Sequence, residues 1–260
     1  MKTKHGAALG VAVWTIVAVK GLAAEGHDDG WQNGIALPLW AAGINGNVTV
    51  KGIKQDVDVS FDELKDHLDA AFGLEFTARK DKVCIYTGFG YLKLSGAGGG
   101  GGNGGVSDDL KFLIADAGVS YQLLKAGEEH PFILEATAGI RYWWAKNELK
   151  FTGPRGVLAF DGSASKDLVD PVIGLRGSKY FTRKLHLDFA GDIGGFGISD
   201  TQADLDWSAT GLVSYDFTKW FTLSGGYKAL ALDYSTGSGS NKNGLDLIIN
   251  GVLFTANFKF

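Results

Sequence analysis

The sequence predicts an all-β protein, a closed antiparallel transmembrane β-barrel of about ten strands with one short helix in its first extracellular loop. The closing segment, residues 251–260 (GVLFTANFKF), alternates apolar and polar residues with the period of a strand, and at least eight earlier segments repeat this pattern. The 39 glycines against 4 prolines, with 12% aromatic residues, fit a β-protein with many turns. After the N-terminal segment no apolar run is long enough for a membrane helix, so the chain must cross a membrane as strands.

The N-terminal segment has the layout of a secretory signal peptide. Basic residues come first, then an apolar run shorter than a membrane helix needs, then small residues: Lys2, Lys4, residues 7–19, Gly21, Ala23 and Ala24. We expect cleavage after Ala24, with Ala23 as the alternative site. The chain therefore divides into a signal peptide, residues 1–24, and one outer-membrane β-barrel, residues 25–260.

Charge and cysteine content exclude several classes of function. Cleavage removes Lys2, Lys4 and Lys20, so 22 of the 25 basic residues remain against 29 acidic ones, a formal charge of −7. This balance disfavours nucleic acid as a partner. The single cysteine, Cys84, excludes an internal disulfide framework and a multi-cysteine metal site. We expect no metal and no cofactor.

The first strand is predicted over residues 31–52, with a break at Pro38 that is tolerable near a membrane edge. A short helix should follow, because Ser60 and Glu63 have the spacing of a capping box. Its apolar face would consist of Phe61, Leu64 and Leu68. The helix either packs on the barrel rim or dips inside as a plug, and the rim is favoured.

Regular hairpins follow this helix. The predicted strands are residues 72–79, 83–94, 110–124, 132–149, 166–181, 185–198, 204–217, 221–234 and 245–260. The glycine-rich run 96–105 lacks the Lys and Ser or Thr of a phosphate-binding loop and is interpreted as a flexible surface loop, as is the polar segment 152–166.

Loop lengths and aromatic residues give an orientation. Short and long connections alternate along the chain, and barrels of this class place short turns in the periplasm and long loops outside. An even number of strands then returns the C-terminus to the periplasm. The cluster Tyr142, Trp143 and Trp144 is expected where its strand crosses the lipid headgroups.

Three segments carry a resemblance to a known group. WQNGIALPLWAAGINGNVTVKG (31–52), DVDVSFDELKDHLDAAF (56–72) and DPVIGLRGSKY (170–180) together resemble an uncharacterised family of proteobacterial outer-membrane β-barrel proteins, similar to the small OmpA/OmpW-like barrels. The terminal Phe260, with Phe254 and Phe258, looks like the assembly signal of such barrels. The resemblance implies a monomer in the cell outer membrane whose partners are membrane lipid, lipopolysaccharide and the barrel-assembly machinery. It names no activity.

Inward-facing charges are the candidate functional residues. They form a predicted lumen network: Glu75, Arg79, Asp116, Glu135, Arg141, Asp170, Arg176, Asp188, Asp192, Asp206 and Lys228. A barrel of about ten strands is narrow, so Arg and carboxylate side chains would close it by pairing. A structural core is favoured over a narrow path for ions or small solutes. Counting residues from the turns predicts that Arg176 lies between Glu135 and Asp188, and that Arg141 meets Asp170.

An enzyme is the alternative from another class. A rim hydrolase or protease needs a nucleophile or activated water with a base near the outer mouth. Only His67, flanked by Asp66 and Asp69, is predicted on that side, and a charged helix face is usually just solvated. We therefore expect no catalysis, and a structural or surface-interaction role with at most slight pore activity.

Overall fold

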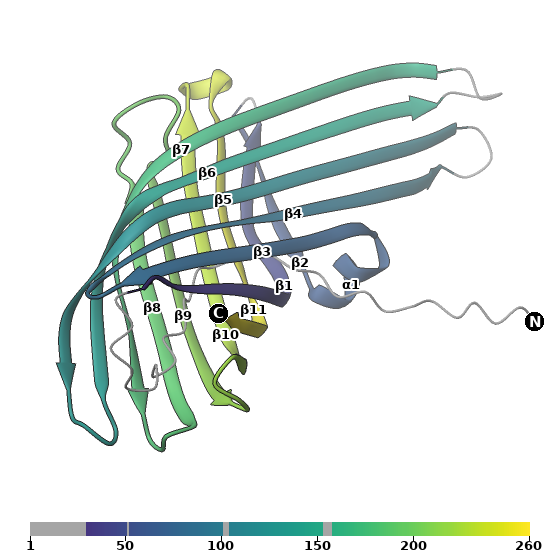
Figure 1. The fold of residues 1–260 in the computed structure, drawn as a ribbon. Coiled ribbons are helices and arrows are strands. Elements are labelled where there is room, and N and C mark those ends of the chain that lie inside the picture. Colours follow the sequence, from purple (N-terminus) through teal and green to yellow (C-terminus); the bar gives the residue numbers. More distant parts are fainter. Residues whose placement is uncertain (1–29, 51, 101–103, 153–157) are drawn as a thin grey trace, which may run out of the picture.

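Antiparallel strands that follow one another around the wall make a closed barrel in the computed structural model, which describes residues 30–50, 52–100, 104–152 and 158–260 (Figure 1). The predicted signal peptide lies outside these residues. Pairing of the first strand with the last, from Gly34↔Lys259 to Thr49↔Gly244, closes the wall. The elements are β1 (Gln32–Val50), β2 (Ile53–Val59), α1 (Phe61–Asp66), β3 (Leu68–Lys80), β4 (Val83–Gly100), β5 (Gly104–Ala126), β6 (Phe132–Thr152), β7 (Leu158–Tyr180), β8 (Leu185–Gly195), β9 (Leu205–Asp216), β10 (Phe221–Thr236), the 3-10 turn η2 (Gly239–Asn241) and β11 (Asn243–Lys259).

The wall has ten strand positions, as the sequence predicts, because β2 and β3 share one of them. β3 pairs with the lower part of β1, from Gln32↔Arg79 to Ala36↔Glu75. β2 pairs with its upper part, from Ile44↔Val59 to Val50↔Ile53. The sequence interpretation placed no strand at β2. It also expected a break in the first strand at Pro38, whereas β1 runs through Pro38 and stays paired with β11 there.

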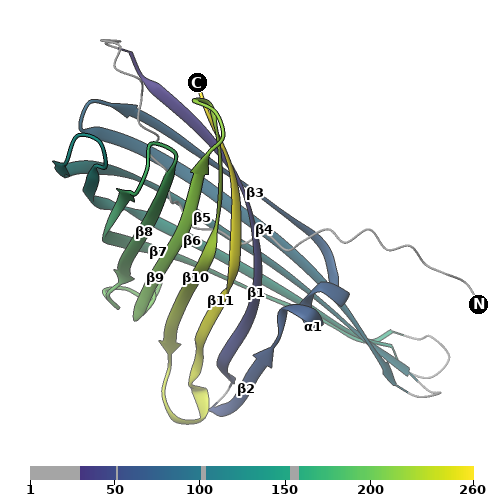
Figure 2. The ribbon, with the colours of Figure 1, turned by 90° about the horizontal axis from the view of Figure 1, so that it is seen from below.

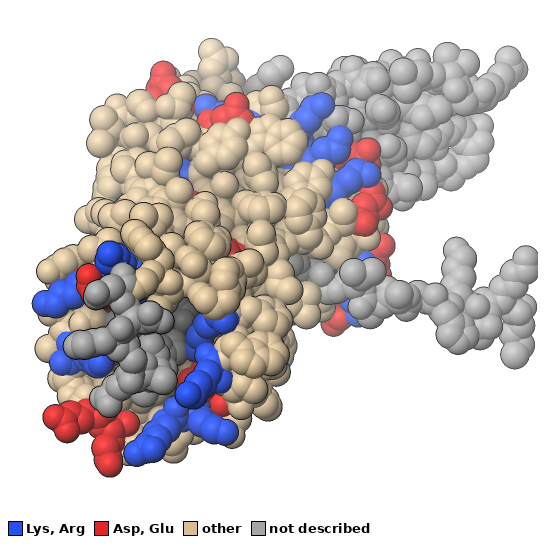
Figure 3. Space-filling model, viewed as in Figure 1, with Lys and Arg blue, Asp and Glu red and all other residues tan. Residues whose placement is uncertain are grey.

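Strand alternation places apolar side chains outside and most polar side chains inside. Val119, Ile173 and Phe254 are about half exposed on three different strands, at 50%, 53% and 53%. In the space-filling view, charged residues gather toward two ends of the molecule and a broad uncharged region lies between them (Figure 3). This arrangement matches an outward apolar band between two polar rims.

Most of two predicted loops, 96–105 and 152–166, instead continues the flanking strands, while residues 101–103 and 153–157 lie outside the described residues. β4 and β5 remain paired as far as Gly100↔Gly104, and β7 begins at Leu158, opposite Thr152 at the end of β6. Glycine disfavours strands, but backbone hydrogen bonds to neighbouring strands maintain the ladder regardless of side chain. The outer parts of β4–β7 therefore project beyond β3 and β8 as a four-stranded extension (Figure 1).

Helix α1 begins with the predicted capping box. Ser60 N–H donates to Glu63 Oε2 at 2.8 Å, and the Glu63 N–H donates to Ser60 Oγ at 3.3 Å. These bonds hold the pKa of Glu63 below its ordinary value, with the Ser60 backbone bond as the largest cause. Leu68, predicted on the helix face, begins β3 instead, while Leu64 is buried against the barrel interior. No helix in the described ranges is both long and apolar enough to span a membrane.

Removing Phe260 should slow membrane insertion and leave the finished fold little changed. Its backbone exchanges two hydrogen bonds with Asn33, each 2.9 Å, at the end of a long β1–β11 ladder, and its side chain is exposed. Insertion rates into vesicles, followed by the gel shift between heated and unheated samples, would measure this. Phe181→Ala, at an exposed turn phenylalanine, is the control. Equal insertion rates for the wild-type and truncated chains would contradict the assembly-signal prediction.

Candidate functional site: the barrel interior

The first ionic cluster is centred on Glu135. Arg176 Nε donates to Glu135 Oε2 at 2.8 Å, and Arg79 Nη2 donates to Glu135 Oε1 at 2.5 Å. Ser120 Oγ donates to Glu135 at 2.8 Å and accepts from Arg176 Nη2 at 2.5 Å. The Arg176 guanidinium also lies 5.3 Å from the ring centre of Tyr86. One buried carboxylate on β6 is thus joined to β3 and β7 through two arginines and to β5 through Ser120.

The second cluster is centred on Arg141. Its Nε donates to Asp116 at 2.8 Å, and its Nη1 donates to Asp206 at 2.6 Å and Asp192 at 3.0 Å. Trp143 Nε1 donates to the other oxygen of Asp206 at 3.0 Å. The three carboxylates come from β5, β8 and β9, so this arginine crosses the lumen from its own strand, β6.

Counting from the turns gave the β6–β7 register correctly, since Glu135↔Arg176 and Arg141↔Asp170 are cross-strand partners, and the predicted pairing of Arg176 with Glu135 is confirmed. Two other predicted pairings are wrong. The Arg141 side chain extends to Asp116, Asp192 and Asp206 and not to its neighbour on β7. Asp170 does not bind Arg141; it accepts the backbone N–H of Ala203 at 2.7 Å. Asp188 lies opposite Ser178, while Arg176 lies opposite Ala190, so Asp188 belongs to a different cluster.

Trp143 also differs from its predicted place. It was expected among the headgroups with Tyr142 and Trp144, but it is only 3% exposed and lies in the lumen. Trp143 is two residues from Arg141 and therefore points to the same side of β6. Treating the three aromatics as one cluster concealed this alternation.

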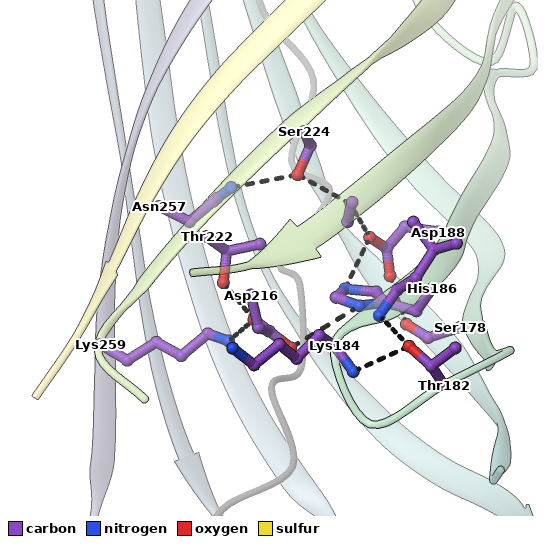
Figure 4. Close-up of polar contacts among 12 residues, drawn as sticks. Ser178, Thr182, Lys184, His186, Asp188, Asp216, Thr222, Ser224, Asn257 and Lys259 are labelled. Atoms are coloured by element: carbon purple, nitrogen blue, oxygen red, sulfur yellow. Dashed lines mark hydrogen bonds and ion pairs between the residues drawn. The ribbon is translucent and has the colours of Figure 1, made fainter. Parts of the chain in front are cut away.

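The third cluster surrounds His186 at the turn end of β8 (Figure 4). His186 Nε2 lies 3.3 Å from Asp188 Oδ2, and Nδ1 lies 3.7 Å from Asp216 Oδ2. Ser178 and Ser214 donate to Asp188, and Thr222 and Lys259 donate to Asp216. His186 is fully buried and stacks on Tyr180 with ring centres 4.5 Å apart.

Of the charged residues of this third cluster, the predicted lumen network included only Asp188. His186 was placed at the periplasmic end of its strand, and Asp216 and Lys259 were not among the predicted lumen charges. Side-chain alternation along the strand could have identified His186. It lies two residues from Asp188 on one strand, so both side chains face the lumen.

Lys228 lies apart from these clusters, beside the seam between β1 and β11. Its Nζ is 4.3 Å from the ring centre of Trp40, a cation–π contact, and has no hydrogen-bond partner in the described structure. Trp40 Nε1 donates to the backbone oxygen of Gly251 at 3.2 Å. Glu75 is buried and one of its oxygens, Oε1, is likewise unpartnered.

An apolar cluster fills the outer half of the lumen, where a polar wall was expected. It comprises Trp40, Ala42, Leu64, Leu92, Leu94, Ile114, Trp143, Leu168, Ala203, Leu212, Leu230, Leu232, Tyr234, Ile249 and Leu253. A cavity of about 30 Å³ lies beside Tyr86, Arg141, Arg176 and Asp192, which is room for one or two waters.

At the outer rim the predicted residues do not assemble into a site. His67 is exposed and ends α1, with its N–H donating to Leu64 O. Asp69 instead accepts from Lys93 at 2.6 Å and Ser95 at 2.5 Å, and the Lys93 bond lowers its pKa. Within the described ranges no three His, Cys, Asp or Glu side chains are grouped to hold a metal ion.

Comparison with known proteins shows the fold and no activity. No protein-family model and no curated protein matches this chain. Among solved structures, it is similar to the outer membrane protease OmpT from Escherichia coli, with 10% identity over 93% of this chain and 100% of that one, at a TM-score of 0.52. Another match is Ail, the attachment invasion locus protein of Yersinia pestis, with 12% identity over 90% of this chain and 100% of that one, at a TM-score of 0.37. The first likeness shows a shared outer-membrane barrel fold.

Proposed function

We propose that this chain is a non-catalytic barrel of the Gram-negative outer membrane with a sealed lumen and a structural or surface-interaction role. The observation that carries the proposal is the way Arg141 joins β6 to β5, β8 and β9 across the lumen. Glu135 joins four strand positions below the apolar cluster in the same way. A path along the barrel axis would have to break both clusters.

The surface presented to partners is the outer extension of β4–β7. It projects where the neighbouring strands have ended, so it lies beyond the apolar band. Membrane lipid and lipopolysaccharide would surround the band, and the barrel-assembly machinery would insert the chain as a monomer.

Conductance in planar bilayers tests the sealed lumen. We expect the purified, folded protein to insert without open steps, since ion pairs and apolar side chains occupy the axis. A porin of known conductance, inserted under the same conditions, is the positive control. Regular open steps from this protein would favour the narrow channel instead.

A separate assay addresses the rim hydrolase or protease. We expect no turnover of peptide or ester substrates by the folded barrel in detergent. Turnover that disappears in both His67→Ala and Asp69→Asn would overturn the non-catalytic proposal, while the conductance result would stand independently.

A further inference from the structure

The ladder between β1 and β3 has a gap. Pairing stops at Ala36↔Glu75, and the other edge of β1 finds a new partner only at Ile44↔Val59. Residues 37–43 of β1 and 68–74 of β3 therefore have no strand partner across this seam, although β1 stays paired with β11 on its other side. An unpaired edge is costly in lipid, so the gap requires an explanation.

Pro38 lies at the position where the ladder fails. Asn33 exchanges both backbone hydrogen bonds with Phe260, so odd-numbered residues of this part of β1 face β11 and even-numbered ones face β3. Residue 38 would make the next hydrogen bonds to β3 after Ala36, and proline has no N–H to donate. Pro38 therefore removes a hydrogen-bond donor from the β1–β3 ladder at the position where the pairing stops.

Helix α1 covers the outer end of the gap. The chain leaves β2 opposite Ile44, forms α1 and returns as β3, so the helix lies beside β1 at the outer end of β3 (Figure 2). Only Leu64 of the helix is buried, against the apolar cluster, while Asp62, Glu63, Lys65 and Asp66 are exposed. Leu64 and the partly buried Phe61 are the helix residues that pack against the cluster, so local opening should cost less free energy than separating paired strands.

The two sides of the gap are apolar. Leu37 and Leu39 on β1, and Phe72 and Leu74 on β3, are exposed on the outer face and belong to the band that faces lipid. Directly inside the gap lies Trp40, at the edge of the apolar cluster. Bilayer chains and the apolar interior are thus separated here by side chains such as those of Leu68 and Ala71 and, at the outer end, by the helix, and not by a paired wall.

We propose that the gap between β1 and β3 is a lateral binding port for an acyl chain of a bilayer lipid, with α1 as its displaceable cover. This goes beyond the sealed-lumen proposal, since the barrel is closed along its axis and accessible from its side. The occupant is an acyl chain because lipid is the medium at the outer mouth of the port and the cluster behind it is apolar.

Tryptophan quenching by lipids brominated in mid-chain tests the port. Trp40 lies behind the gap, whereas Trp143 is similarly buried but lies on β6, which is paired on both sides. The difference between wild type and Trp40→Phe gives the quenching of Trp40, and Trp143→Phe gives the matched control. We expect Trp40 to be quenched at least twofold more strongly than Trp143, and its quenching to rise about twofold in Leu64→Ala.

Two outcomes would overturn the proposal. Equal quenching of Trp40 and Trp143 by brominated chains would mean that lipid does not enter the gap. Quenching of Trp40 by aqueous acrylamide, without quenching by brominated chains, would mean that water occupies it. Leu124→Ala, at an exposed leucine near a turn, controls for general loosening, and the gel shift on heating confirms that each variant is folded.

Discussion

Replacing Arg141 with methionine is expected to destabilise the barrel by about 3–5 kcal/mol, the usual cost of breaking a buried ion pair by removing one partner. Methionine keeps the length of the side chain but leaves Asp116, Asp192 and Asp206 facing one another without a cation. Two of these side chains are nearly inaccessible, at 8% and 0%, so water cannot replace the arginine. The effect should exceed that of Arg176→Met, because Glu135 would still have Arg79.

Urea unfolding of the folded protein in lipid vesicles, followed by tryptophan fluorescence, measures the change. Arg183→Met removes the same group at an exposed turn and should change stability by less than 0.5 kcal/mol or so. Arg141→Lys should fall between wild type and Arg141→Met, because one ammonium can replace the charge but not the planar fork. If Arg141→Met and Arg183→Met unfold at the same urea concentration, the arginine cluster does not hold the lumen together.

Placing a charge on the outer face should be the second large effect. Ala138 is exposed at mid-height on β6, with Val119 and Ile173 as its cross-strand neighbours. Ala138→Arg should cost about 2–4 kcal/mol, the price of a cation near the bilayer midplane. Ala126→Arg, at the turn end of β5, should cost roughly 0–1 kcal/mol, since an interfacial arginine reaches water.

Folding yield into vesicles and urea midpoints compare the two alanine variants. Gly139 next to Ala138 is not a usable inward control, because an added Cβ would lie 2.4 Å from Ala117 O and 3.1 Å from Tyr86 Oη. An arginine there would clash before meeting the polar lumen. Similar losses for Ala138→Arg and Ala126→Arg would show that Ala138 does not face the hydrocarbon.

The facing of residues was predictable from sequence, but contacts across the lumen were not. Alternation of side chains along a strand is local, so Glu135, Arg141 and Arg176 were placed inside correctly. Which charges meet depends on strand tilt and stagger, properties of the whole closed sheet. Arg141 reaches Asp206, three strands away, because of that curvature, and counting from turns could not show it.

The apolar cluster and the shared strand position were missed for a different reason. Residues such as Leu92, Leu230 and Leu253 lie on the inward side, where a polar lumen was assumed, and their alternation with outward apolar residues leaves no two-sided pattern. The β2 segment is short and polar, so it resembled a loop. β2 can pair with β1 only because the pairing between β1 and β3 stops at Ala36, which leaves that edge of β1 free from Ile44 onward.

The positions of the clusters imply an order of assembly. The contacts of Glu135 and Arg141 lie on β3–β9, a continuous sheet that can form before the chain ends meet. Lys228 and Trp40 meet only when β1 joins β11, the same step that brings Asn33 to Phe260. The buried arginines can therefore form their ion pairs before the barrel closes. The contact between Trp40 and Lys228 forms only in the final step, when β1 pairs with β11.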